Sequence, residues 1–463
     1  MRLSALLISV PALLLAACSD APLAQPETAH SENTVIENAE VTTDVYQGDW
    51  SGTLDVGAAQ LRLVLEVRGE SVVLISVDQS GARLPVEVTQ RDEAGFAGTI
   101  ARVGATLELA PETPTTLTGD FTQGGATFPL TLEHERRPTA TSPQTGTPNP
   151  DFIVETDAVR LAGTLQIPES DGPFPTILLL NGSGAQDRNA TVAGQPVFEV
   201  LADELTMRGI ATLRLDDRGV GGSDAVAPAS PHDLADDAVA AMAALREAEG
   251  INAQCVGILG HSEGGLIAFL AGDAADPAFI VSLAGMHGTM AETLYEQSEA
   301  LFLASGAGQA AADQNRALQD AMFAVMRDDA VEDYPAALTE ALTALGLPEA
   351  TARQQGAIWG QDYAIAALDL DPSPAMAGYD GPVHAFFGER DLQVLSAPNT
   401  QRLLAAREGL PTQVTLLPGA NHLFQAAETG LPQEYQTAPH AMSPAALSAI
   451  GDAAEVLVAQ TCE

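Results

Sequence analysis

A serine in a glycine-rich turn is the first residue of this sequence that could do chemistry. Residues 260–265 read Gly-His-Ser-Glu-Gly-Gly and fit the pattern Gly-x-Ser-x-Gly. They lie between an apolar segment expected to form a strand and a segment expected to form a helix, which is the setting this pattern requires. The glycines permit a tight turn that presents Ser262 close to the outward-pointing N–H groups of the helix. The alternative is a plain strand-to-helix turn, and the setting favours a nucleophilic serine.

A serine hydroxyl needs a base, and the base needs a carboxylate that orients it. His422 and Asp391 each follow directly on a short apolar segment expected to be a strand. The chain order Ser262, Asp391, His422 is that of α/β-hydrolases and differs from the order in two other well-known serine hydrolase folds. Glu389 is the rival acid, because it lies two residues before Asp391.

Acyl transfer also needs N–H donors aimed at the developing oxyanion. We expect one donor to be the backbone of Glu263, directly after the nucleophile. The second should come from the loop 181–188, on the backbone of Ser183 or, as the runner-up, of Gly184.

Three neighbouring features are expected to be structural. The glycine-rich loop 217–224 lacks the Lys-[Ser/Thr] ending of a phosphate-binding loop, and the sequence contains no lysine. Arg218 in this loop is expected to brace neighbouring loops. His261 should point to the other side of the strand end and serve in packing.

The scaffold of these residues is expected to occupy residues 151–463. Strand-like and helix-like segments alternate there, which predicts an α/β fold with a mostly parallel central sheet and helices on both faces. The alternation stops at about 286–370, where an Ala-, Gln- and Leu-rich sequence predicts a helical cap. Candidates for lining an acyl pocket, or equally for the core of the cap, are Phe302, Met322, Phe323, Met326 and Trp359.

A second domain is expected before the α/β domain. Residues 46–135 contain short alternating apolar segments separated by turn residues, which predicts a small antiparallel β-rich domain. A spacer or substrate-shaping role is favoured, and a binding module stays open. The Pro- and Thr-rich residues 136–150 are expected to be a linker.

Composition limits the classes of function. The 463 residues include 20 basic and 62 acidic side chains, a formal net charge of −42, so no basic footprint for nucleic acid exists. A hydrophobic content of 46% excludes global disorder. Three cysteines exclude a disulfide scaffold and a multi-cysteine zinc site, and we expect neither a metal nor a cofactor.

The first residues are expected to be a targeting sequence. An arginine and a short apolar run end in Leu-Ala-Ala-Cys, which resembles a bacterial lipobox. By that resemblance residues 1–17 are a signal peptide and Cys18 is lipidated. Residues 18–45 contain several acids and two prolines but no Arg, which predicts a disordered tether. The protein would then be an exported periplasmic or cell-surface lipoprotein held to the membrane by its lipid alone. Ser19 after the cysteine favours the outer membrane by the same resemblance. The alternative is an ordinary secretory signal.

The two other cysteines are candidates for a disulfide. Cys255 opens the strand that leads to Ser262, and helices run antiparallel to strands in such a sheet, so the last helix should bring Cys462 to the same end. An exported protein meets an oxidising compartment. A buried free Cys255 is the alternative.

Together these motifs resemble those of exported bacterial α/β-hydrolase esterases, which are grouped beside serine aminopeptidases and carry a β-rich N-terminal domain and a helical cap. The resemblance implies a cofactor-free carboxylesterase for short-chain esters, with Ser262, Asp391 and His422 as nucleophile, acid and base. Asn181 departs from the family, where many relatives have His. A peptidase or other amide hydrolase, and a binding protein with an inactive triad, remain alternatives.

Overall fold

The computed structural model describes residues 46, 48–55, 60–68, 71–76, 82–92, 95–113, 116–135, 146–156, 158–228 and 230–462. These residues form two compact units, one before residue 141 and one after it. The expected signal peptide, Cys18 and the tether lie outside the described residues, so the lipid anchor and the location stay predictions. Residues 136–145 of the expected linker also lie outside, but its last five residues belong to a strand.

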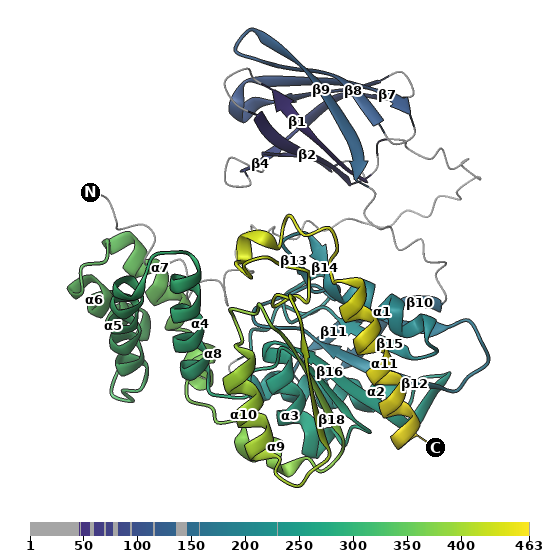
Figure 1. Cartoon of the computed structure of the whole chain (residues 1–463), viewed down its shortest axis with the longest axis vertical. Helices are drawn as coiled ribbons and strands as arrows, with labels where there is room; N and C mark the ends of the chain where they lie inside the picture. The colour runs from purple at the N-terminus through teal and green to yellow at the C-terminus, as the bar shows by residue number, and fades with distance from the viewer. Residues whose placement is uncertain are drawn as a thin grey trace, which may run out of the picture. The chain divides into compact units, whose positions relative to one another are not determined.

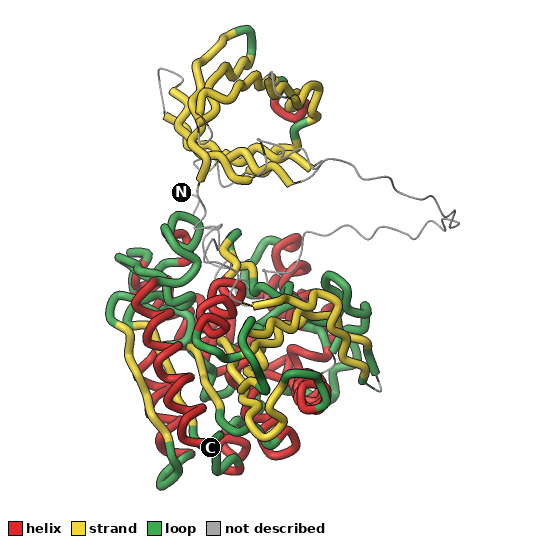
Figure 2. The backbone as a smooth tube through the Cα atoms, turned by 90° about the vertical axis from the view of Figure 1, so that its right-hand side faces the viewer, coloured by secondary structure: helices red, strands yellow, loops and turns green. Residues whose placement is uncertain are grey.

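The N-terminal unit is a single antiparallel sheet with the order β4-β3-β2-β1-β9-β8-β7-β6-β5. Figure 2 shows that this sheet is strongly curved. Alternating side chains such as Leu63, Leu65 and Val67 on β2 fill its core together with Trp50. The strands are β1 (Gly48–Asp55), β2 (Gln60–Arg68), β3 (Ser71–Ser76), β4 (Ala82–Pro85), β5 (Glu87–Asp92), β6 (Gly95–Ile100), β7 (Ala105–Thr113), β8 (Thr116–Gln123) and β9 (Ala126–Glu135).

The second unit is built on an eight-stranded sheet with the order β10-β11-β15-β12-β16-β17-β18-β19. β11 pairs antiparallel with β10 and with β15, and every other neighbouring pair is parallel. The strands are β10 (Gly146–Glu155), β11 (Arg160–Pro168), β12 (Phe174–Leu180), β15 (Ala211–Leu215), β16 (Ile251–His261), β17 (Ile280–Leu283), β18 (Val383–Gly388) and β19 (Thr412–Leu417). The predicted α/β fold with a mostly parallel sheet is thereby confirmed.

Helices cover both faces of this sheet, as Figure 1 shows. Apolar side chains of α2 (Pro231–Arg246), α3 (Glu263–Ala275), α9 (Ser373–Gly378) and α10 (Ser396–Ala406) pack in one cluster with the strands. Those of α1 (Val197–Met207) and α11 (Pro444–Thr461) pack in a second cluster on the other face. The central strands are therefore buried on both sides, which explains their continuous apolar sequence.

The sequence also sets where the last helix begins. The Ser443 hydroxyl accepts the N–H of Ala446, and Pro444 takes the first helical position, where its missing N–H costs nothing. At the other end of α11, Cys462 forms a disulfide with Cys255 on β16, and their Cα atoms are 5.2 Å apart. The disulfide ties the last helix to the central strand.

The segment between β17 and β18 forms the cap, and in its described residues we find helices and no strand. α4–α8 gather beside the sheet in Figure 1 and enclose an apolar core of their own. The cap helices are α4 (Met290–Ala304), α5 (Gln309–Met326), α6 (Tyr334–Ala344), α7 (Glu349–Trp359) and α8 (Asp362–Ala367). Within the part of the chain that the structure describes, no helix combines the length and hydrophobicity needed to cross a membrane.

Candidate active site

Five loops that carry polar side chains meet at one edge of the sheet. They follow β12, β15, β16, β18 and β19, all of which run in the same direction. The carboxyl ends of these strands therefore lie together, and this is the place where open α/β sheets bind their ligands.

Ser262 occupies the sharp turn between β16 and α3. Its backbone has φ 56° and ψ −117°, a left-handed conformation that an L-residue adopts only at a cost of about 1–3 kcal/mol. The turn is possible because Gly260 and Gly264 have no Cβ atoms. A Cβ at Gly260 would lie 2.0 Å from the Gly264 carbonyl oxygen, and a Cβ at Gly264 would lie 2.3 Å from the Leu180 carbonyl oxygen. Both glycines are thus required for α3 to start directly after the serine.

His422 and Asp391 form the hydrogen bond that the sequence predicts for a base and its acid. Nδ1 of His422 lies 2.8 Å from Oδ2 of Asp391. The other carboxylate oxygen accepts the backbone N–H groups of Gln393 and Val394, at 2.8 and 2.9 Å. Because Nδ1 carries the proton that it donates to Asp391, Nε2 is left free to accept one. Glu389, the rival acid, instead accepts the N–H of Gly419 at 2.9 Å, so the structure does not bring it to the histidine.

A short turn after β19 holds His422 in place. The Asn421 side chain accepts the N–H groups of Leu423 and Gln425, both at 3.0 Å, and its backbone N–H bonds to the Gln425 carbonyl. Asn421 and Gln425 are fully buried. Hydrogen bonds within residues 421–425 therefore hold the turn in one conformation, and His422 lies within it.

The loop after β12 is clamped onto the loop after β15. Asp217 accepts the N–H of Gln186 at 2.8 Å and the side-chain amide of Asn181 at 3.0 Å. Arg188 forms two side-chain hydrogen bonds to Asp216, of 3.0 and 2.6 Å. These contacts fix the segment that contains Ser183 and Gly184, the predicted second oxyanion donors. Asn181, where relatives were expected to carry histidine, serves as an anchor of this loop.

Burial gives Asp217 unusual acid–base behaviour. It raises the pKa of this carboxyl to about 7, and the hydrogen bonds from Gln186 and Asn181 only partly oppose this. The neighbouring Arg218 was expected to brace loops, but its two hydrogen bonds of 2.6 and 2.8 Å go to Asp237, so it ties its loop to helix α2 instead.

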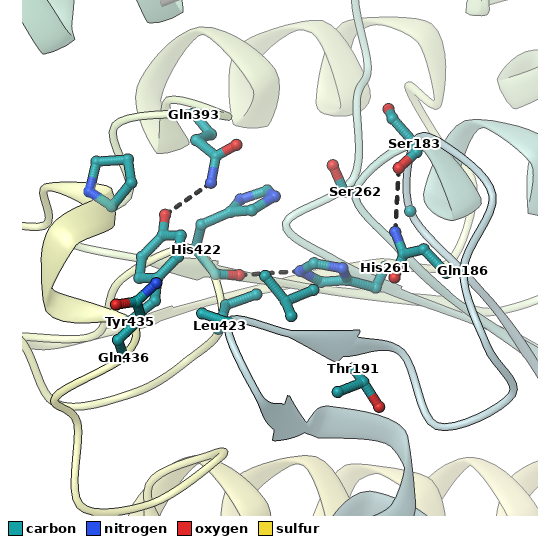
Figure 3. A pocket seen from close by; sticks show the side chains of 14 residues that line it. Ser183, Gln186, Thr191, His261, Ser262, Gln393, His422, Leu423, Tyr435 and Gln436 are labelled. Atoms are coloured by element: carbon teal, nitrogen blue, oxygen red, sulfur yellow. Dashed lines mark hydrogen bonds between the residues drawn. The ribbon is translucent and has the colours of Figure 1, made fainter. Parts of the chain in front are cut away.

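A cavity of about 360 Å³ opens above Ser262 and His422 (Figure 3). One wall comes from the loop after β12 and the small hairpin of β13 (Thr191–Val192) and β14 (Gln195–Pro196), the other from residues 423–436. Ser183 lines this cavity beside the nucleophile. None of the described lining residues carries a carboxylate or a guanidinium group.

His261 differs from its expected role, because it also lines the cavity. Its Nε2 lies 2.9 Å from the carbonyl oxygen of His422, and the two rings are 4.8 Å apart between centroids. The cavity lies at the end of β16, so His261, the last residue of the strand, and Ser262, the residue after it, both line it. Burial lowers the pKa of His261 to about 3, which keeps the ring neutral. Because its Nε2 faces a carbonyl oxygen, which only accepts, Nε2 carries the proton and donates it.

The cap side chains offered as pocket-lining candidates pack elsewhere. Met322, Phe323, Met326 and Trp359 belong to the apolar core of the cap, and Phe302 is buried at 2% exposure without lining the cavity. Their alternative role, as cap core, is the one the structure supports. Sequence reasoning missed the polar lining residues, which have no distinguishing pattern around them: Gln186, Thr191, Gln393, Tyr435 and Gln436.

No described group of three His, Cys, Asp or Glu side chains is arranged to hold a metal ion.

Residues 196–332, which contain the nucleophile turn and half of the cap, match the family described as serine aminopeptidase, S33. The strand order and the Ser, Asp, His sequence after β16, β18 and β19 agree with this match. The chain has the α/β-hydrolase fold.

Similarity to individual proteins covers parts of this chain. It is 31% identical to Esterase EstD of Thermotoga maritima over 122 residues, and it spans only 29% of the length of that curated relative. An α/β hydrolase from Penicillium sp. sh18 is 15% identical, with a TM-score of 0.43 over 69% of this chain and 99% of that one. An esterase from Pyrococcus furiosus is 13% identical, with a TM-score of 0.43 over 70% of this chain and 95% of that one.

Proposed function

We propose that this protein is a serine carboxylesterase that acts on small, uncharged esters through an acyl-enzyme. The observation that carries the proposal is the hydrogen bond of 2.8 Å between His422 and Asp391 at the wall of the cavity that Ser262 lines. The similarity to an esterase over part of the chain agrees with it.

The reaction follows from the roles of these groups. The Ser262 oxygen attacks the ester carbonyl while Nε2 of His422 takes its proton, and Asp391 stabilises the resulting imidazolium. The carbonyl oxygen becomes an oxyanion next to the backbone N–H groups of Glu263 and Ser183, with Gly184 as the runner-up. The imidazolium then protonates the departing alcohol. Water, activated by His422, attacks the acyl-enzyme and releases the acid.

The cavity favours an ester over a peptide with a free amino terminus. A buried ammonium group needs a carboxylate partner, because an unpaired buried charge is strongly disfavoured. The described lining offers amide, hydroxyl, imidazole and apolar groups but no carboxylate. A volume of about 360 Å³ lies at the small end of ligand pockets and fits a short acyl chain.

The test is the Ser262→Ala variant together with parallel assays on p-nitrophenyl acetate and an aminoacyl-nitroanilide. We expect hydrolysis of the acetate by the wild-type protein, a loss of about 10³-fold or more in the variant, and little cleavage of the anilide. Labelling by a fluorophosphonate should disappear in the same variant. Preference for the anilide would make the protein an amide hydrolase. No turnover and no labelling would leave a binding protein.

A further inference from the structure

The nucleophile and its base come from strands that are not neighbours. Ser262 follows β16 and His422 follows β19, and β17 and β18 lie between these two strands in the sheet. Neighbouring strands lie about 4.8 Å apart, so three steps across the sheet separate β16 from β19 by about 14 Å. The loop after β19 must therefore fold back along the edge of the sheet to bring His422 to the cavity that Ser262 lines. Strand pairing alone does not set the position of the base relative to the nucleophile.

His261 makes a direct contact between these two parts of the site. It is the last residue of β16, directly before the nucleophile, and its Nε2 donates to the carbonyl oxygen of His422 over 2.9 Å (Figure 3). The two rings also approach each other, with 4.8 Å between their centroids. No other donor of a described residue bonds to this carbonyl oxygen. The bond joins residues 161 positions apart, and it ties the backbone of the base to the residue beside the nucleophile.

The ring of His261 is itself held in place, so it can act as a rigid support. The residue is 5% exposed, and its backbone pairs with Leu283 on β17. A Cβ at Gly182 would lie 3.4 Å from Nδ1 of His261, so the loop after β12 packs closely against that side of the ring. The Phe424 ring meets it edge-on, with 6.5 Å between the centroids. The donor therefore has little freedom to move.

The two segments that this bond joins both contain strained backbone. Ser262 has φ 56°, and Phe424, in the turn that contains His422, has φ 59°. Residues other than glycine keep such a conformation only where the surrounding contacts hold it, and they cluster at functional sites. The hydrogen bond from His261 is one contact that holds the turn of the base.

We propose that His261 is a positioning residue, which sets the place of the His422 imidazole relative to the Ser262 hydroxyl through its bond to the His422 backbone. This inference rests on the proposed esterase function. Asp391 controls the orientation and tautomer of the imidazole, whereas His261 controls where the residue that carries it lies. Such control matters because a misplacement of about 1 Å in a reacting group can lower a rate by about 10²-fold.

Removal of the donor should slow the reaction more than it weakens substrate binding. His261→Leu lacks Nε2, and we expect kcat for p-nitrophenyl acetate to fall by about tenfold or more while KM stays within about threefold of wild type. His261→Gln places an amide nitrogen near the position of Nε2, and it should keep kcat within about threefold of wild type. The rate of labelling by a fluorophosphonate should follow the same order.

His384→Leu is the matched control. His384 is also a strand histidine, and its Nε2 lies 2.8 Å from the hydroxyl oxygen of Thr415. It is close to the start of β18, at the other end of the strand from the reaction, and it does not line the cavity. This variant should retain wild-type kinetics.

A double-mutant cycle with His422→Ala tests whether His261 acts through the base. Triad variants keep a residual rate above that in water, so a further loss can be measured. If His261 positions the imidazole, His261→Leu should cause no further loss once the imidazole is absent. A role in general packing, or directly on the substrate, would lower the residual rate again.

Three results would overturn the inference and leave the esterase proposal standing, provided that the wild-type protein hydrolyses the ester. They are a loss of kcat in His261→Leu smaller than about tenfold, a His261→Gln variant no faster than His261→Leu, and multiplied effects in the cycle.

Folding of the variants is checked by circular dichroism. Should His261→Leu fail to fold, His261→Phe takes its place, because it keeps a ring without the donor. Failure of both to fold would make His261 a residue of stability and overturn the positioning role. A wild-type protein without ester hydrolysis and without fluorophosphonate labelling would overturn both proposals.

Discussion

Asp391 is held more firmly than any other group of the catalytic set. One of its oxygens binds His422 Nδ1, and the other accepts two backbone N–H groups from the turn that follows β18. These contacts leave the carboxylate a single orientation, with one oxygen reserved for the imidazole. The side chain therefore selects the tautomer of His422 and stabilises the charge that forms on it.

Asp391→Asn should remove most of the activity without unfolding the protein. The amide can satisfy the backbone donors with its oxygen only if its NH₂ group faces His422, which forces the wrong tautomer. We expect kcat for p-nitrophenyl acetate to fall by about 10⁴-fold, with unchanged circular dichroism. Glu389→Gln is the control and should retain most of the rate, since Glu389 binds Gly419. A larger loss in the control would exchange the acid assignment.

His287 offers a test of pH-dependent stability away from the reaction. It is fully buried between Ser282 and Asn399, and burial lowers its pKa from 6.5 to about 4. Between these pH values the unfolded chain binds a proton there that the folded chain does not. The free energy of unfolding should therefore fall with falling pH, by about 1.4 kcal/mol per pH unit for this group.

The His287→Gln variant lacks that proton. Urea unfolding at pH 4.5, 5.5 and 6.5 should give a pH dependence of stability that is less steep than in the wild type by about this amount. Parallel curves for the two proteins would contradict the assigned pKa.

At the level of single residues, candidate catalytic residues could be predicted from the sequence where a reactive side chain directly follows an apolar strand. That holds for Ser262, Asp391 and His422, which the structure brings to one edge of the sheet. Gln393 and Tyr435 carry no comparable signal, because neutral polar residues occur in most loops. Their place in the cavity depends on how residues 423–436 fold back, and that depends on tertiary contacts.

At the level of elements, the central strands of the second unit were predictable from the sequence, whereas its first strand, β10, was not. β12, β16 and β18 are buried on both faces and read as continuous apolar runs. β10 contains Pro148 and Pro150, which indicated a linker. It pairs only with β11 and forms the edge of the sheet, where proline is tolerated because no neighbour needs its missing N–H.

The walls of the cavity, rather than the core of the cap, should select the acyl chain. Val192→Phe adds a ring to the β13–β14 hairpin and fills part of the cavity. We expect kcat/KM for p-nitrophenyl hexanoate to fall by about tenfold or more relative to the acetate, because bulk in a packed site excludes bulk in the ligand.

Phe323→Leu, in the core of α5, is the matched control and should leave this ratio unchanged while it loosens the cap. A changed ratio in the cap variant and none in the hairpin variant would return the acyl pocket to the cap.

At the level of the whole molecule, two arginines serve as braces between helices. Arg407 is 1% exposed and donates to the carbonyl groups of Met376, Tyr379 and Gly381, which ties α10 to the end of α9. Arg208 bridges α1 and α11 through Glu204 and Asp452. With 20 basic against 62 acidic side chains, the chain has a large excess of negative charge, which favours solubility.

The disulfide between Cys255 and Cys462 is the covalent counterpart of these braces, and it closes a loop of 207 residues. Its loss should destabilise the protein by as much as about 5 kcal/mol, because a long loop gains much conformational freedom in the unfolded chain when it is opened. Catalysis should be spared. Cys255 lies near the start of β16, whereas Ser262 follows its carboxyl end.

We therefore expect Cys462→Ser to lower the urea midpoint strongly while kcat on p-nitrophenyl acetate at 25 °C stays within about twofold of wild type. Wild-type protein treated with dithiothreitol should unfold like the variant, which separates the bond from the substitution itself. If oxidised wild type and the variant share one midpoint, the bond does not stabilise the fold, and α11 is held by its apolar face alone.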